Sequence, residues 1–67
     1  MMLSVYNDER GNNVQLSVDF DENYFPQKYT VCVNYKNTNF PGTKRGAAEA
    51  RRYYRNTVSA FEKKNDR

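Results

Sequence analysis

The sequence predicts a small α+β domain of order β-β-β-α, in which a three-stranded antiparallel sheet is followed by one C-terminal helix packed on one face. Apolar and polar residues alternate in three segments of the first half, as they do in half-buried strands. From about residue 44 the apolar spacing changes to three and four, which is typical of an amphipathic helix. A chain of 67 residues has room for one such domain, placed at residues 1–67.

The three strands are expected at about residues 1–6, 14–20 and 29–36. The segment VQLSVDF alternates without a break, and MLSVY and YTVCVNY show the same period of two. The links NDERGNN and DENYFPQK are short, so the strands should form an antiparallel meander. The strand residues expected in the core are Leu3, Val5, Val14, Leu16, Val18, Phe20, Val31 and Val33. Those expected on the far face are Ser4, Gln15, Ser17, Asp19, Thr30 and Asn34.

The helix is expected at about residues 44–63, with a frayed tail at 64–67. The preceding run KNTNFPGT contains a proline and a glycine, which favour a turn over a strand interior. Thr43 can cap the helix N-terminus, although Gly46 stands where the glutamate of a capping box would be. The residues expected to face the sheet are Ala47, Ala50, Tyr54, Val58 and Phe61.

The composition argues against catalysis and metal binding. The chain has no histidine and one cysteine, Cys32, so it lacks the commonest general base, the usual zinc ligand sets and a partner for an internal disulfide. We therefore expect no enzyme activity, no metal and no cofactor. The acidic run DFDEN lacks the glycine and distal glutamate of a calcium loop and is expected to be a solvated turn. No signal peptide or long apolar run is apparent, so a cytoplasmic location and no membrane partner are expected.

Charge is divided along the chain. The formal net charge is +3, but residues 1–27 carry −4 and residues 28–67 carry +7. An acidic and a basic end are therefore expected, and such asymmetry suggests an anionic partner.

The basic residues of the segment RGAAEARRYYRN gather on one side of a helical wheel. Glu49 can pair with Arg45 and Arg52, but each pair contributes only about 0.2–0.5 kcal/mol and cannot neutralise the face. Lys44 and Arg45 oppose the helix dipole, and with Gly42 and free backbone N–H groups they suggest a phosphate site. The candidate binding residues are Lys44, Arg45, Arg51, Arg52, Arg55, Lys63 and Tyr53. The alternative interpretation is a solvated face whose arginine stems cover hydrophobic edges.

Two short resemblances accompany this basic segment. The stretch GTKRGAAEARRYY is similar in layout to the start of the last helix of double-stranded-RNA-binding domains, where paired basic residues meet phosphates across a groove. Residues 28–55 bear a looser likeness to the three-stranded arm-binding domains of phage integrases, which read DNA with the open sheet face. The first helix of the former family is missing, and the open face here is neutral to acidic, so the chain is assigned to neither family.

Two functional hypotheses follow. The first is a non-enzymatic module whose basic helix docks on RNA, DNA or a nucleoprotein surface. The second is a small phage-type effector that binds and inhibits a host protein through acidic loops, exposed aromatic residues or a sheet edge. The residues of this second interface would be Asp19, Asp21, Glu22, Tyr24, Phe25 and Phe40. A structural or self-associating role, including a homodimer formed through a sheet edge, also stays open.

Overall fold

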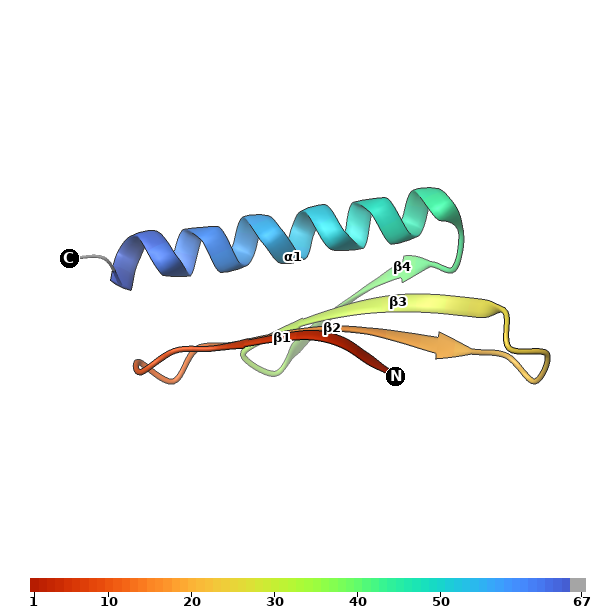
Figure 1. Ribbon diagram of the computed structural model, residues 1–67, viewed down its shortest axis with the longest axis horizontal. Coiled ribbons are helices and arrows are strands. Elements are labelled where there is room, and N and C mark those ends of the chain that lie inside the picture. The colour runs from red at the N-terminus through yellow and green to blue at the C-terminus, as the bar shows by residue number, and fades with distance from the viewer. Residues whose placement is uncertain (66–67) are drawn as a thin grey trace.

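A computed structural model describes residues 1–65 as a four-stranded antiparallel sheet with one helix packed against one face (Figure 1). The strands are β1 (Met2–Asn7), β2 (Asn13–Phe20), β3 (Pro26–Val33) and β4 (Lys36–Pro41), paired in the order β1-β2-β3-β4. The helix α1 spans Lys44–Asn65. The predicted α+β class, the meander and the C-terminal helix are confirmed, but the sheet has a fourth strand.

The fourth strand arises because the segment predicted as one strand at 29–36 turns back at Asn34 and Tyr35. Both residues have positive φ angles, 48° and 74°, and they form the two-residue loop between β3 and β4. A two-residue loop with two positive φ angles matches the twist of a hairpin, although glycine is usual at its second position. Tyr35 occupies that position here, which hid the turn. Pro41 ends β4, an edge strand, where proline is tolerated.

The other two hairpins share one construction, built on an aspartate. Oδ1 of Asp8 accepts hydrogen bonds from the backbone N–H groups two and four residues further on, at 3.0 and 2.9 Å. Oδ1 of Asp21 does the same at 2.8 and 3.0 Å. The fourth residue of each turn has a positive φ, 86° at Gly11 and 66° at Tyr24. The segment DFDEN therefore enters a turn, as predicted, and Asp21 builds it.

The core lies between α1 and the middle of the sheet. Figure 1 shows the helix running along one side of the sheet, and it packs mainly on β2, β3 and β4. The buried hydrophobic residues are Val14, Leu16, Val18, Val31, Ala47 and Ala50, all predicted to be in the core. Tyr54, Val58 and Phe61 of the predicted helix stripe pack against this cluster.

The predicted orientation of β1 is wrong. Val5 pairs with Gln15 on the open face of the sheet and is 54% exposed, whereas Tyr6 pairs with Val14 on the helix face. The ring of Tyr6 stacks on that of Phe61, with centroids 6.4 Å apart. A period of two cannot tell which face is buried when both faces of a strand carry apolar side chains. Pairing with β2 decided it.

Two further residues predicted for the core lie at its margins. Leu3 is 39% exposed, and the pairing register shifts beside it, between Met2 and Ser4. Phe20 is 40% exposed and follows a second shift, between Asp19 and Phe20. Such irregularities re-aim side chains at the ends of strands.

The N-terminus of α1 packs tightly against the end of β4. Oγ1 of Thr43 accepts the Gly46 N–H at 3.0 Å, which confirms the predicted cap. A Cβ atom on Gly46 would lie 1.9 Å from the carbonyl oxygen of Pro41. The capping-box glutamate is therefore absent because only glycine fits at this position.

The C-terminus of α1 reaches the turn between β1 and β2, beyond the predicted end at Lys63. Nδ2 of Asn65 donates hydrogen bonds to Oδ2 of Asp8 at 2.8 Å and to the hydroxyl of Tyr6 at 3.1 Å. The first two residues of the predicted frayed tail are thus helical, and residues 66–67 lie outside the described part of the chain.

Candidate anion-binding groove

An open groove of about 680 Å³ lies between α1 and the β1 side of the sheet. It exists because α1 packs mainly on the other three strands, and because Ala48 and Ser4 are too small to fill the space beside β1. We call it the arginine groove. It is lined by Leu3, Ser4, Leu16, Ala48, Arg51, Arg52, Tyr54 and Arg55.

Three arginines of α1 form the basic wall of this groove. Arg51 and Arg55 are one helical turn apart, Arg52 is adjacent, and all three side chains are exposed. The ion pairs within residues 1–65 are Lys28–Asp19 and Arg45–Glu49, so neither involves the groove. The three guanidinium groups therefore carry positive charge that no carboxylate of the described residues neutralises at close range.

The lining of the groove is suited to binding an anion. A guanidinium group presents a planar fork of N–H donors that matches two oxygens of a phosphate or carboxylate. Leu3, Leu16 and Tyr54 add apolar contact surface beside the charge. Burial raises the pKa of Tyr54 above 10.0, so its hydroxyl stays neutral at physiological pH.

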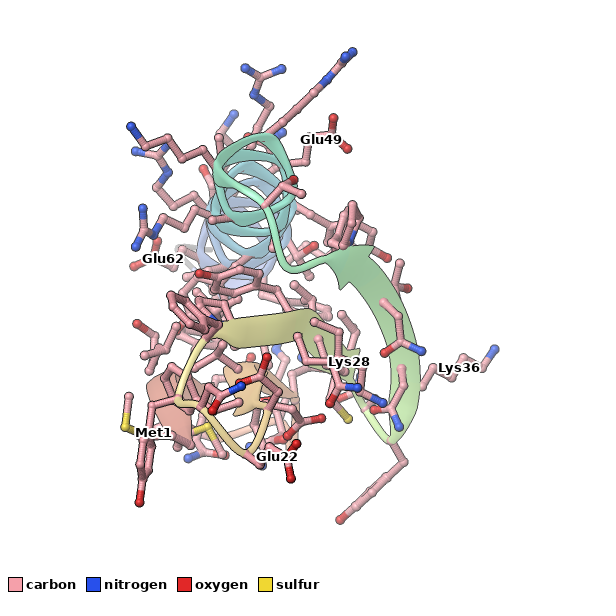
Figure 2. The ribbon with its side chains drawn as sticks, turned by 90° about the vertical axis from the view of Figure 1, so that its right-hand side faces the viewer. Met1, Glu22, Lys28, Lys36, Glu49 and Glu62 are labelled. Atoms are coloured by element: carbon pink, nitrogen blue, oxygen red, sulfur yellow. The ribbon has the colours of Figure 1, made fainter. Side chains whose placement is uncertain are left out.

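The remaining predicted basic residues lie on α1 but outside the groove. Figure 2, which looks along α1, shows nitrogen-tipped side chains fanning away from the sheet, with Glu49 and Glu62 at the margins of the fan. Arg45 bonds Glu49 at 3.2 Å, as predicted, while the predicted Glu49–Arg52 pair is not formed. Lys44 and Lys63 are exposed. Their part in binding stays a prediction, as does the phosphate site at the N-terminus, where Thr43 already takes one N–H group.

Tyr53 lies on the opposite flank of α1 from the arginines. Its ring contacts Phe40 of β4 edge-on, with centroids 5.9 Å apart, and 39% of the residue is exposed. Tyr53 and Phe40, each predicted as a binding residue under one of the two hypotheses, thus close one side of the core. They are not brought together with the arginine groove.

The acidic candidates divide in the same way between structural contacts and free surface. Asp21 builds the β2–β3 turn, and Oδ2 of Asp19 lies 3.7 Å from Nζ of Lys28 across the same hairpin. Tyr24 and Phe25 are 85% and 65% exposed, and Glu22 is exposed beside them. Asp19 and Asp21 are also exposed, but both are engaged in contacts within the hairpin. The loop tip carries the other exposed residues of this predicted surface.

Sequence reasoning missed the lining residues that are not charged. Ala48 precedes Arg51 by three residues and Arg52 by four, so its place beside them on α1 was readable from the sequence. Leu3 and Ser4 could not be found, because they line the groove only through the position of β1 against β2.

Comparisons with known proteins found no significant match. No protein-family model matches the chain, and no curated protein or solved structure is significantly similar to it. The fold alone therefore gives the class, a small α+β domain. Within residues 1–65, no helix is both long and apolar enough to cross a membrane. Over the same residues, no cluster of three or more potential ligand side chains is placed to hold a metal ion.

Proposed function

We propose that this protein is a non-enzymatic nucleic-acid-binding module that contacts the phosphate backbone with the arginine flank of α1. The observation that carries the proposal is the placement of Arg51, Arg52 and Arg55 along an open groove, without a carboxylate partner among residues 1–65. Repulsion between like charges one turn apart costs a few tenths of a kcal/mol, and a bound polyanion would relieve it. Nearby Lys44 and Arg45 extend the same positive field along the helix.

The contact should be electrostatic and largely independent of base sequence. Three phosphate contacts would give a slope of log K against log salt of about −2.7 on duplex DNA and about −2.1 on a single strand. Fluorescence anisotropy with labelled duplex DNA, duplex RNA and single-stranded oligonucleotides measures both affinity and slope.

A matched pair of variants distinguishes binding through the groove from an effect of net charge alone. Arg51, Arg52 and Arg55 are changed to Ala in one variant, and the control variant changes Arg10, Lys36 and Lys64 to Ala. Both triple variants take the formal net charge from +3 to 0. Arg10 lies in the β1–β2 turn, Lys36 begins β4 and Lys64 lies near the end of α1, so the control cations are away from the groove.

The groove variant should lose most of its affinity and show a slope lower by about one unit per lost contact, while the control keeps most of both. Equal losses in the two variants would mean that net charge alone drives binding. Absence of binding by the wild-type protein to any oligonucleotide at low salt would refute the proposal.

A second candidate function is binding to another protein through the β2–β3 loop. The observation that favours it is the exposure of Tyr24 and Phe25 next to Glu22, because exposed aromatic rings are common anchors of interfaces. Pull-down from lysate with nuclease treatment distinguishes the two functions. A protein captured after nuclease by the wild type, but not by a Tyr24→Asn, Phe25→Ser variant, would support this role. Asn is suited to position 24 because it tolerates the positive φ.

A further inference from the structure

The strand β1 is an uncharged, apolar edge of the sheet. Residues 1–7 contain no charged side chain. Four of the exposed large hydrophobic residues gather here: Met1 is 67%, Met2 50%, Leu3 39% and Val5 54% exposed. An exposed apolar edge strand is a template for pairing with another strand.

The opposite edge is built differently. The strand β4, KNTNFP, starts with Lys36 and ends with Pro41, and three of the four residues between them are Asn or Thr. Lysine and proline are common means of preventing pairing at an edge. The β1 edge has neither lysine nor proline, and its ladder is irregular only between Met2 and Ser4, ahead of Val5.

The backbone groups available for pairing follow from the register of the β1–β2 hairpin. The Asp8 N–H donates to the Asn12 carbonyl oxygen at 3.1 Å. Hydrogen-bonded and non-hydrogen-bonded pairs alternate in an antiparallel ladder, so Val5 and Asn7 are non-hydrogen-bonded towards β2. Their N–H and C=O groups point outward, to the free edge.

We propose that two copies of the chain pair β1 with β1 in antiparallel fashion about a two-fold axis at Val5, which joins two four-stranded sheets into one of eight strands. Val5 would then face Val5 of the other copy, and Leu3 would pair with Asn7. Val5 meets its own copy at the axis, and no like charges oppose each other within Met2–Asn7, as a self-complementary interface requires. An acidic or basic partner strand would find no charge on β1 to recognise.

The pairing also completes the arginine groove, an argument that rests on the proposed function. The groove opens beside β1, and a two-fold axis perpendicular to the sheet keeps both helices on the same face. The two grooves then merge into one trough with Arg51, Arg52 and Arg55 on each wall. Because α1 is centred near β3, five strand spacings separate the helix axes, or about 24 Å.

The oligomeric state, measured without nucleic acid by light scattering and sedimentation, tests the pairing. The wild type should reach twice the chain mass of 7.9 kDa as its concentration rises. Val5→Lys places two like charges opposite each other at the axis and should raise the dimer dissociation constant at least tenfold. Its control, Asn37→Lys, lies in the same cross-strand row on the β4 edge and should stay dimeric. Circular dichroism verifies that both variants fold.

Cross-linking provides a second readout that does not depend on a charged variant. In a Cys32→Ser background, Val5→Cys should form an intermolecular disulfide rapidly, because hydrogen-bonded partners have Cα atoms about 5.5 Å apart, within disulfide range. Asn37→Cys should not. A wild-type protein that stays at one chain mass up to its solubility limit, or a disruption by Asn37→Lys instead of Val5→Lys, would overturn the inference. A monomer that still binds oligonucleotides through its arginines would leave the proposed function standing.

Discussion

Replacing Gly46 by alanine should destabilise the protein, although helix propensity alone predicts the opposite. Gly46 lies in the first turn of α1. In a helix interior, alanine is favoured over glycine by about 1 kcal/mol. The added Cβ, however, would lie 1.9 Å from the carbonyl oxygen of Pro41 and 2.8 Å from its carbonyl carbon. Real Cβ contacts are essentially never shorter than 3.0 Å, so the helix must move away from β4 by more than 1 Å.

The magnitude follows from what that movement disturbs. Overpacking of this kind costs about 1–3 kcal/mol. Weakening the Thr43 cap on the Gly46 N–H adds about 1 kcal/mol, and the gain in propensity offsets a similar amount. The free energy of unfolding should therefore fall by about 1–3 kcal/mol, a large part of the total for a domain of this size.

Urea unfolding followed by circular dichroism measures this change. At an m-value of about 1 kcal/mol/M, the midpoint of Gly46→Ala should drop by about 1–3 M. The control is Ala60→Gly at an exposed position of α1, where propensity alone should cost about 1 kcal/mol. Both variants should then be less stable than the wild type, although one replaces glycine by alanine and the other replaces alanine by glycine. A Gly46→Ala protein as stable as the wild type, or more stable, would show that the helix does not approach β4 this closely.

Two further predictions concern the turns. Tyr35→Gly should raise the free energy of unfolding by about 0.5–1 kcal/mol in the same urea assay, because glycine accepts the φ of 74° without strain. A destabilised variant would contradict the positive-φ turn that Tyr35 forms with Asn34. The hydrogen bond from Asn65, with those from Asn12, lowers the pKa of Asp8 below its ordinary 3.8. A carboxylate whose pKa is lower in the folded state stabilises the fold above its unfolded pKa, and this stabilisation is lost as the pH falls from there through the folded pKa. The wild-type thermal midpoint should therefore decline more steeply than that of Asp8→Asn between about pH 5 and about pH 2. Parallel curves for the two proteins would remove Asp8 from this role.

Strand pairing decided which apolar residues of β1 are buried, and sequence periodicity could not. The strand β2 has apolar residues on one face only, and its predicted inward set of Val14, Leu16 and Val18 is buried. In β1 apolar side chains occupy both faces. Burial of Tyr6 against Phe61, with its hydroxyl near Asn65, settles the orientation and leaves Val5 outside.

The candidate site shows the same division. The grouping of Arg51, Arg52 and Arg55 on one flank is a consequence of helical periodicity and was predicted from the sequence. The groove in front of them was not, because it depends on how far α1 is displaced from β1 across the sheet.

The sequence by itself determined the α+β class, the meander, the single capped helix and its arginine flank, because these follow from periods of two and of three to four and from local turn and cap chemistry. The tertiary structure decided the rest. It split the predicted third strand at a turn without glycine, turned Tyr6 inward and Val5 outward, and left β1 as a free apolar edge beside the groove. The turn at Asn34 and Tyr35 is local, but it lacks the glycine that usually marks such a loop. The orientation of β1 and its free edge depend on contacts between segments distant in the chain, whose energies no local pattern records.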